Sequence, residues 1–133
     1  MVTAVDSSVL IALDKREPDS EEWLELLRSA RSTGQLVVCD VVVAEVSSLF
    51  ADSRDFIAFL RDLHINFDPV GPEAAIEAGR LFRAYRRSGG PRLHLIPDFL
   101  IGAHALHQAD QLAAADRGYL RRHFPRLNVG APS

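Results

Sequence analysis

The sequence contains little cysteine, little lysine and no long run of apolar residues. Cys39 is the only cysteine among 133 residues, which excludes an internal disulfide and indicates a reducing, cytoplasmic location. No apolar segment approaches the roughly 18 residues that a membrane-spanning helix needs. The opening residues lack the basic region and apolar core of a secretory signal. We therefore expect neither a membrane span nor export.

Positive charge is also scarce in the first part of the chain. The net charge is −3, but residues 1–78 carry −9 and residues 79–133 carry +6. Of the 15 basic residues, 14 are arginine, and Lys15 is the only lysine. Arginine pairs with phosphate through two parallel hydrogen bonds, so the arginine-rich part suits a polyanion. A solvated surface that uses arginine in place of lysine would explain the preference equally well, but not the uneven distribution.

Short apolar segments alternate with amphipathic ones along the whole chain, and 47% of the residues are hydrophobic. Length and composition fit one folded domain over residues 1–133. The apolar segments predict strands at Val2–Val5, Leu36–Cys39, Ile65–Phe67, Gln111–Ala115 and Leu127–Val129. The alternation predicts an α/β fold, a three-layer domain whose mostly parallel sheet of four to five strands is flanked by helices.

Capping residues and apolar spacing predict helices between these strands. The expected helices begin at Ser7 or Ser8, at Ser20, after Asp40, at Ser53, at Pro72, at Pro97 and at Arg117. Asp40 is expected to cap a helix that reaches Phe50, and Pro97 to open the helix that contains Asp98.

Acidic residues stand at the predicted junctions between strands and helices. Asp6 follows the first strand, and Asp116 follows the strand at Gln111–Ala115. The carboxyl ends of parallel strands line one crevice, so both side chains are expected to point into it. Glu45 and Asp98 are each embedded among apolar neighbours, where a charge is costly to bury without compensation. A solvated Glu45 is therefore the less plausible interpretation.

These four acids predict a metal site, because carboxylates that share a crevice repel one another and raise their pKa values. Mg²⁺ or Mn²⁺ offsets the repulsion, since both ions prefer oxygen ligands. Such an ion would orient a water molecule and stabilise charge on a phosphate. The alternative is structural, with Asp6 and Asp98 as helix N-caps and Asp116 in a turn.

Four segments resemble proteins of the PIN domain family: Val5–Leu13, Val43–Val46, Pro97–Ala103 and Ala115–Tyr119. The segment Tyr119–Leu127 is similar to the VapC toxins of bacterial and archaeal toxin–antitoxin pairs. The resemblance implies a metal-dependent endoribonuclease that cleaves RNA in the cytoplasm and is held inactive by a VapB-like antitoxin protein. It also implies a homodimer, and a heterotetramer or larger assembly with the antitoxin.

The resemblance assigns four acids to the binding of Mg²⁺ or Mn²⁺ and to activation of the attacking water: Asp6, Glu45, Asp98 and Asp116. Ser8 matches a hydroxyl that relatives carry two residues after the first aspartate, and would orient Asp6. The sequence departs from the family at Ala114, where many relatives carry Thr, Ser or Asn. The missing hydroxyl favours one tightly held ion, with Asp6 and Asp98 as direct ligands and the other two acids acting through water.

Other side chains support weaker hypotheses. Arg86, Arg92 and Arg117 flank the acids and are candidates for contacts with RNA phosphates. His104 and His107 stand three residues apart, but no third nitrogen or sulfur ligand completes a zinc site. We interpret both histidines as surface or satisfied polar residues.

Other functions are also considered. A haloacid-dehalogenase-like phosphatase needs an aspartate at Ser8, and a response-regulator receiver needs a lysine late in the chain. The phosphate-binding loop GxxxxGK followed by Ser or Thr is absent. These three are disfavoured. A PIN-like nuclease that is not a toxin stays open, as does a non-catalytic PIN scaffold that binds RNA or protein.

Overall fold

The computed structural model describes residues 1–89, 95–115 and 118–132. Its centre is one sheet of five strands in the order β3-β2-β1-β4-β5, and every neighbouring pair is parallel. The strands are β1 (Val2–Val5), β2 (Gln35–Val38), β3 (Ile65–Phe67), β4 (Gln111–Ala113) and β5 (Val129–Gly130). The prediction of an α/β domain with a mostly parallel sheet of four to five strands is confirmed.

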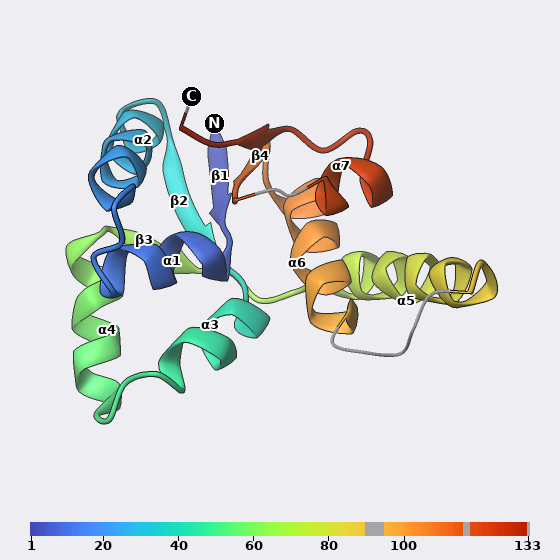
Figure 1. Ribbon diagram of the computed structural model, residues 1–133, viewed down its shortest axis with the longest axis horizontal. Helices are drawn as coiled ribbons and strands as arrows, with labels where there is room; N and C mark the ends of the chain where they lie inside the picture. The colour runs from blue at the N-terminus through green and yellow to red at the C-terminus, as the bar shows by residue number, and fades with distance from the viewer. Residues whose placement is uncertain (90–94, 116–117, 133) are drawn as a thin grey trace.

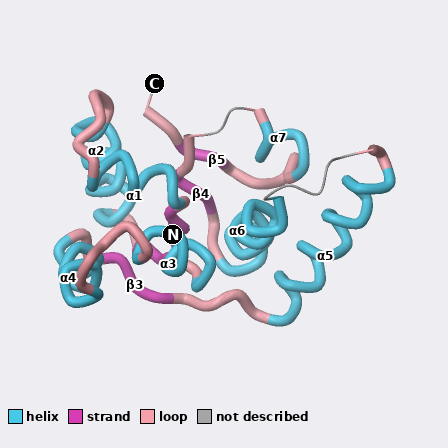
Figure 2. Tube along the Cα trace, turned by 60° about the horizontal axis from the view of Figure 1, so that its bottom comes forward, coloured by secondary structure: helices cyan, strands magenta, loops and turns pink. Residues whose placement is uncertain are grey.

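Helices occupy most of the connections between the strands. They are α1 (Ser7–Asp14), α2 (Ser20–Ser32), α3 (Asp40–Ser47), α4 (Ser53–Asp62), α5 (Pro72–Arg87), α6 (Leu95–Gln108) and α7 (Tyr119–His123). Helices α1 and α2 lie on one side of the sheet, and α5, α6 and α7 lie on the other (Figures 1 and 2). Within the described residues, no helix is both long enough and apolar enough to cross a membrane.

The central strands are buried because helices cover both faces of the sheet. The last three residues of β1 and of β2 are all buried, as expected for strands inside a parallel sheet. Phe99 of α6 is fully buried and meets the rings of Phe82 and Phe124. A Cβ at Gly102 would come within 2.4 Å of the Phe124 ring, so glycine lets α6 approach that ring.

Three predicted helix starts are wrong, one of them that of α7, which begins at Tyr119 and not at Arg117. Cys39, not Asp40, is the N-cap residue of α3, and Asp40 instead accepts a hydrogen bond from the Val70 backbone N–H at 3.0 Å. Helix α3 also ends at Ser47, before Phe50. Helix α6 begins at Leu95, so Pro97 lies within its first turn, where a missing N–H is tolerated.

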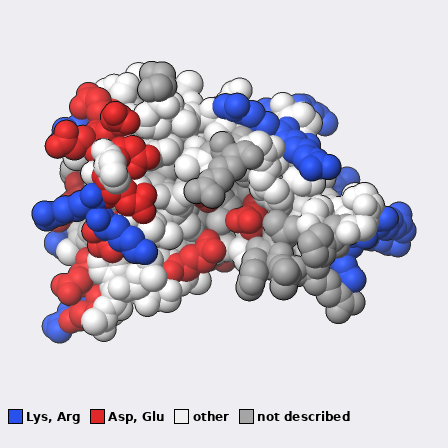
Figure 3. Space-filling model, in the orientation of Figure 1, with Lys and Arg blue, Asp and Glu red and all other residues white. Residues whose placement is uncertain are grey.

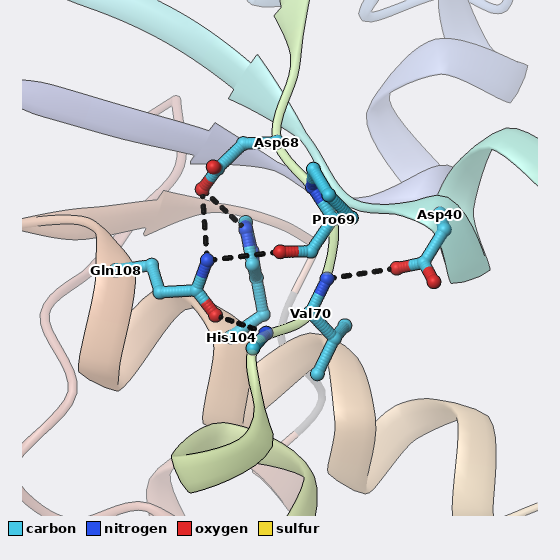
Figure 4. Close-up of polar contacts among 7 residues, drawn as sticks. Asp40, Asp68, Pro69, Val70, His104 and Gln108 are labelled. Carbon is cyan, nitrogen blue, oxygen red and sulfur yellow. Dashed lines mark hydrogen bonds and ion pairs between the residues drawn. The ribbon is translucent and has the colours of Figure 1, made fainter.

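A partly buried polar network around His104 fixes the connection between β3 and α5 (Figure 4). The Nε2 atom of His104, a residue only 1% exposed, lies 2.9 Å from Oδ2 of Asp68. The amide nitrogen of Gln108 donates to the same oxygen and to the Pro69 carbonyl, at 3.1 and 3.0 Å. Its amide oxygen accepts from the Gly71 N–H at 2.8 Å. His104 is thus a satisfied polar residue, as predicted.

Candidate active site

Asp6 stands where β1 ends and α1 begins. It is the N-cap residue of α1, and its Oδ2 accepts from the backbone N–H of Ser8 at 3.2 Å and from the Ser8 hydroxyl at 2.5 Å. The Asp6 N–H donates to the Ala113 carbonyl, and the Ser8 Oγ accepts from the Ala115 N–H at 3.2 Å. These bonds tie the start of α1 to the end of β4. The structural interpretation of Asp6 as an N-cap therefore holds, and its carboxylate is oriented by the same contacts.

Glu45 reaches the same edge of the sheet from α3. The hydroxyl of Ser7, a buried residue, donates to Oε1 of Glu45 at 2.7 Å. The expectation that Glu45 is not solvated is wrong, because the residue is exposed. The apolar residues next to it in sequence point elsewhere on the helix, and the buried side of α3 is formed by Val42 and Val46. The contact with Ser7 was not predicted.

Asp98 lies in the first turn of α6 and is half-buried. Partial burial, followed by the negative charges of Asp6 and Glu45, raises the pKa of Asp98 to about 6. Asp6 and Glu45, which are far from Asp98 in the sequence, therefore act on it electrostatically. The fold brings together β1, α3 and α6 at the carboxyl ends of the strands, where ligands bind in open parallel sheets.

The Tyr119 hydroxyl is a second unusual group beside Asp98. The oxygen is buried and has no hydrogen-bond partner within the part of the chain that the structure describes. Burial, followed by the charge of Asp98 and the nearby Tyr85, raises the pKa of Tyr119 well above its usual value. Its ring lies 4.7 Å from that of His123 and 5.7 Å from that of Phe99, measured between ring centres. The sequence analysis predicts a helix over this segment but gives no sign that the Tyr119 hydroxyl is buried beside Asp98.

The remaining sequence candidates are distributed unevenly. Asp116, Arg92 and Arg117 lie outside the described residues. Arg86 is exposed in the last turn of α5. Ala114 is fully buried, so its methyl group belongs to the core. A cavity of about 680 Å³ lies beside α2, and none of the candidate acids lines it.

The carboxylate oxygens of this site are the kind of ligand that a hard cation prefers. Within residues 1–89, 95–115 and 118–132, no three or more His, Cys, Asp or Glu side chains cluster closely enough to hold a metal ion by themselves. The charges of Asp6 and Glu45 nevertheless repel that of Asp98, and with partial burial as the larger cause they raise its pKa. Magnesium keeps several water ligands and needs only one or two protein carboxylates. The three residues therefore suit an ion bound partly through water.

The surface charge follows the same division as the sequence. In the orientation of Figure 1, acidic side chains lie in the middle of the visible face, around α3 and beside α6 (Figure 3). Basic side chains gather over α5 and α7 on the right of the view, and a smaller number lie among the acidic side chains on the left. A negatively charged polymer that reached the central acids would therefore find its favourable surface on the α5 and α7 side.

Comparison with known proteins agrees with this architecture. The profile of the PIN domain family matches residues 3–124. A search of curated protein sequences found no match.

Solved structures with a similar fold include two VapBC proteins and a toxin–antitoxin complex. The chain is similar to VapBC2 from Rickettsia felis, solved with a DNA fragment from its promoter, with a TM-score of 0.74, 16% identity and 98% of each chain covered. VapBC-1 from nontypeable Haemophilus influenzae has a TM-score of 0.71 and 18% identity to this chain, with 98% of this chain and 97% of the other covered. A toxin–antitoxin complex from Klebsiella pneumoniae has a TM-score of 0.66 and 18% identity, with 98% of each chain covered.

Proposed function

The chain belongs to the PIN domain family, and from that premise we propose that it is a metal-dependent endoribonuclease and the toxin of a toxin–antitoxin pair. The observation that carries the proposal is the crowding of Asp98: partial burial, followed by repulsion from the charges of Asp6 and Glu45, raises its pKa to about 6. A divalent cation relieves such repulsion and suits hydrolysis of a phosphodiester bond. We treat residues 1–133 as a single PIN domain.

Each site residue receives a role in this proposal. Asp6 and Asp98 hold Mg²⁺ or Mn²⁺, while Glu45 and Asp116 act through bound water. When bound, the ion supplies an activated water and stabilises negative charge on the phosphate. Ser8 donates to Asp6 and keeps its carboxylate in place.

The three arginines named from the sequence, Arg86, Arg92 and Arg117, are proposed to contact phosphates of the RNA. Arg86 is exposed on α5, and a guanidinium group binds a phosphate through two hydrogen bonds. Such contacts position RNA without reading its sequence.

The proposed partner is a VapB-like antitoxin, with the chain itself a homodimer and the complex a heterotetramer or larger. Support comes from the toxin–antitoxin complexes whose fold the chain shares over nearly its whole length. We place the protein in the cytoplasm, where a free thiol persists. Burial raises the pKa of the Cys39 thiol, so it stays protonated and unreactive.

Cleavage of RNA in the presence of Mg²⁺ or Mn²⁺ tests the nuclease proposal. Asp6→Asn and Asp98→Asn should each lower the cleavage rate by at least about 100-fold, because the ion loses a direct ligand. Asp14→Asn is the matched control, since Asp14 is exposed at the end of α1, and it should cleave at the unsubstituted rate. Equal cleavage by all four proteins would rule out the site.

A non-catalytic PIN scaffold is the second candidate. It is favoured by the buried methyl of Ala114, where a hydroxyl is frequent in the family, and by the lack of a compact three-ligand cluster among the described residues. Calorimetric titration with Mn²⁺ separates the two. A nuclease should bind Mn²⁺ in a manner that depends on Asp6 and Asp98, whereas a scaffold should not.

A further inference from the structure

The second half of α5 presents four arginines along one side of the helix: Arg80, Arg83, Arg86 and Arg87. With 3.6 residues per turn, these positions fall within about one third of the helix circumference. All four residues are exposed. We call this stripe the arginine ridge.

The acids within the described residues leave most of the arginine ridge unpaired. Of the four ridge arginines, only Arg80 forms an ion pair with a described residue, 3.3 Å from Oε2 of Glu77, and Glu77 is shared with His107. The ion pairs found there include none with Arg83, Arg86 or Arg87. Three guanidinium groups therefore remain available to an external anion.

The helix dipole explains only part of the ridge. Cations in the last turn of a helix interact favourably with its negative end, which accounts for Arg86 and Arg87. The effect fades within one turn, and Arg83 lies a turn earlier. A further reason is needed for an unpaired arginine at that position.

Shallow depressions flank the ridge on both sides. One of about 370 Å³ is lined by Gly79, Phe82, Arg83, Arg86 and Arg87. The other, of about 570 Å³, is lined by Arg80, Arg83, Ala84, Arg87 and Ser88. Neither contains an acidic residue, and Arg83 and Arg87 border both. The small residues between the arginines leave room for a group such as phosphate beside the guanidinium planes.

We infer that the arginine ridge binds the phosphate backbone of the RNA strand that enters the acidic site. This inference rests on the proposed nuclease function. Helix α5 packs along α6, whose first turn carries Asp98, so the ridge and the acids belong to one pair of helices. The basic side chains at the α5 end lie to one side of the central acids (Figure 3).

The chemistry of the ridge favours RNA over an acidic protein. From Arg80 to Arg87 the helix rises about 10 Å, which spaces the guanidinium groups along a line. A protein interface usually has an apolar centre with aromatic residues. The large apolar side chains that are exposed among the described residues do not include any within the ridge. A row of arginines without an apolar centre suits a regularly charged strand.

The test is binding of a fluorescent single-stranded RNA of mixed sequence, followed by anisotropy with EDTA present so that no cleavage occurs. The ridge variant is Arg83→Gln/Arg87→Gln. The control is Arg28→Gln/Arg31→Gln, which removes two exposed arginines from α2 on the other side of the sheet. Both variants lose the same charge, and circular dichroism checks that both keep their helices.

The ridge variant should bind RNA at least about tenfold more weakly at low salt. The slope of log affinity against log salt concentration should become shallower by about 1.4. The variant loses two phosphate contacts, and each contact on a single strand contributes about 0.7 to the slope. The control should stay within twofold of the unsubstituted protein. Arg83→Lys/Arg87→Lys should keep most of the salt dependence, because it keeps the charge.

Two results would overturn the inference: an unchanged affinity in the ridge variant, or an equal loss in the ridge variant and the control. Cleavage by the unsubstituted protein with Mn²⁺ is measured separately. If that protein cleaves RNA while the ridge variant binds normally, the ridge inference fails alone. If RNA binds through the ridge but is never cleaved, the nuclease proposal fails and the ridge stands as the RNA surface of a scaffold.

Discussion

Two aspartates occupy the same place relative to their strands and have opposite surroundings. Asp68 directly follows β3, and its Oδ2 accepts from His104 and Gln108, both on α6 (Figure 4). Asp6 directly follows β1, but its side chain accepts only from Ser8 among the described residues, and it faces Asp98 as a like charge.

The difference shows how one sequence feature can serve two purposes. Donors from another element turn the carboxylate of Asp68 into a link between β3 and α6, which stabilises the fold. The like charges near Asp6 repel one another. This repulsion lowers the stability of the folded protein and favours the binding of a cation. We expect substitutions in the two regions to have effects of opposite sign.

The largest expected effect on stability comes from His104→Ala. The substitution leaves a cavity at a residue that is 1% exposed and removes one of the two side-chain donors to Asp68. We expect the free energy of unfolding to fall by about 3 kcal/mol, measured by urea denaturation. The control is His107→Ala, which loses a partly exposed contact with Glu77 and should cost less than about 1 kcal/mol. Similar losses for both would contradict the distinction.

Addition of Mn²⁺ should stabilise the protein by binding to the carboxylates of Asp6, Glu45 and Asp98, and not to Asp68. At a concentration about 100 times the Kd, binding adds about 2.7 kcal/mol to the free energy of unfolding, which thermal denaturation detects as a higher Tm. The Asp68→Asn variant should keep this shift and Asp98→Asn should lose it. A full shift in Asp98→Asn would show that the ion binds elsewhere.

Without metal, the two aspartates should respond oppositely to the same substitution. Asp98→Asn removes a repelled charge and should raise the free energy of unfolding at pH 7 by about 1 kcal/mol, discounted for partial solvent exposure. Asp68→Asn weakens the acceptor for His104 and Gln108 and should lower it by about 1 kcal/mol. Urea denaturation with EDTA measures both, and the same sign for both would refute the comparison.

The smallest expected effect is the change with pH of the stability that Asp98→Asn gains over the unsubstituted protein. The pKa of Asp98 is raised from 3.8 to about 6 in the folded protein, so the folded state binds its proton more tightly than the unfolded state does. The stability it contributes is complete below about pH 4 and disappears as the pH rises through 6. The advantage of Asp98→Asn over the unsubstituted protein should therefore grow between pH 4 and pH 7, then level off. A constant difference across this range would argue against the raised pKa.

Much of the fold could be predicted from local patterns. Val2–Val5 and Ile65–Phe67 are strands with the predicted bounds, because short apolar, partly β-branched segments have few other uses in an alternating chain. Helix starts were harder. Pro97 looked like the first residue of a helix, yet α6 begins two residues earlier because its first turn tolerates proline.

The candidate acids could be named because each stands at a strand end or inside an apolar helix segment. Their surroundings could not. Ser7 lies 38 positions from Glu45, and Asp68 lies 36 positions from His104, so only the packing of helices on the sheet decides these contacts. The exposure of Glu45 likewise depends on which side of α3 meets the core.

The order of residues thus determined roughly where the strands lie along the chain and that they form a parallel sheet, because periodicity and capping act over a few neighbouring positions. Tertiary structure alone decided which carboxylate gained donors and which met like charges. Hydrogen bonds and electrostatic repulsion depend on distance in space, and the chain reaches those distances only once distant segments have packed together.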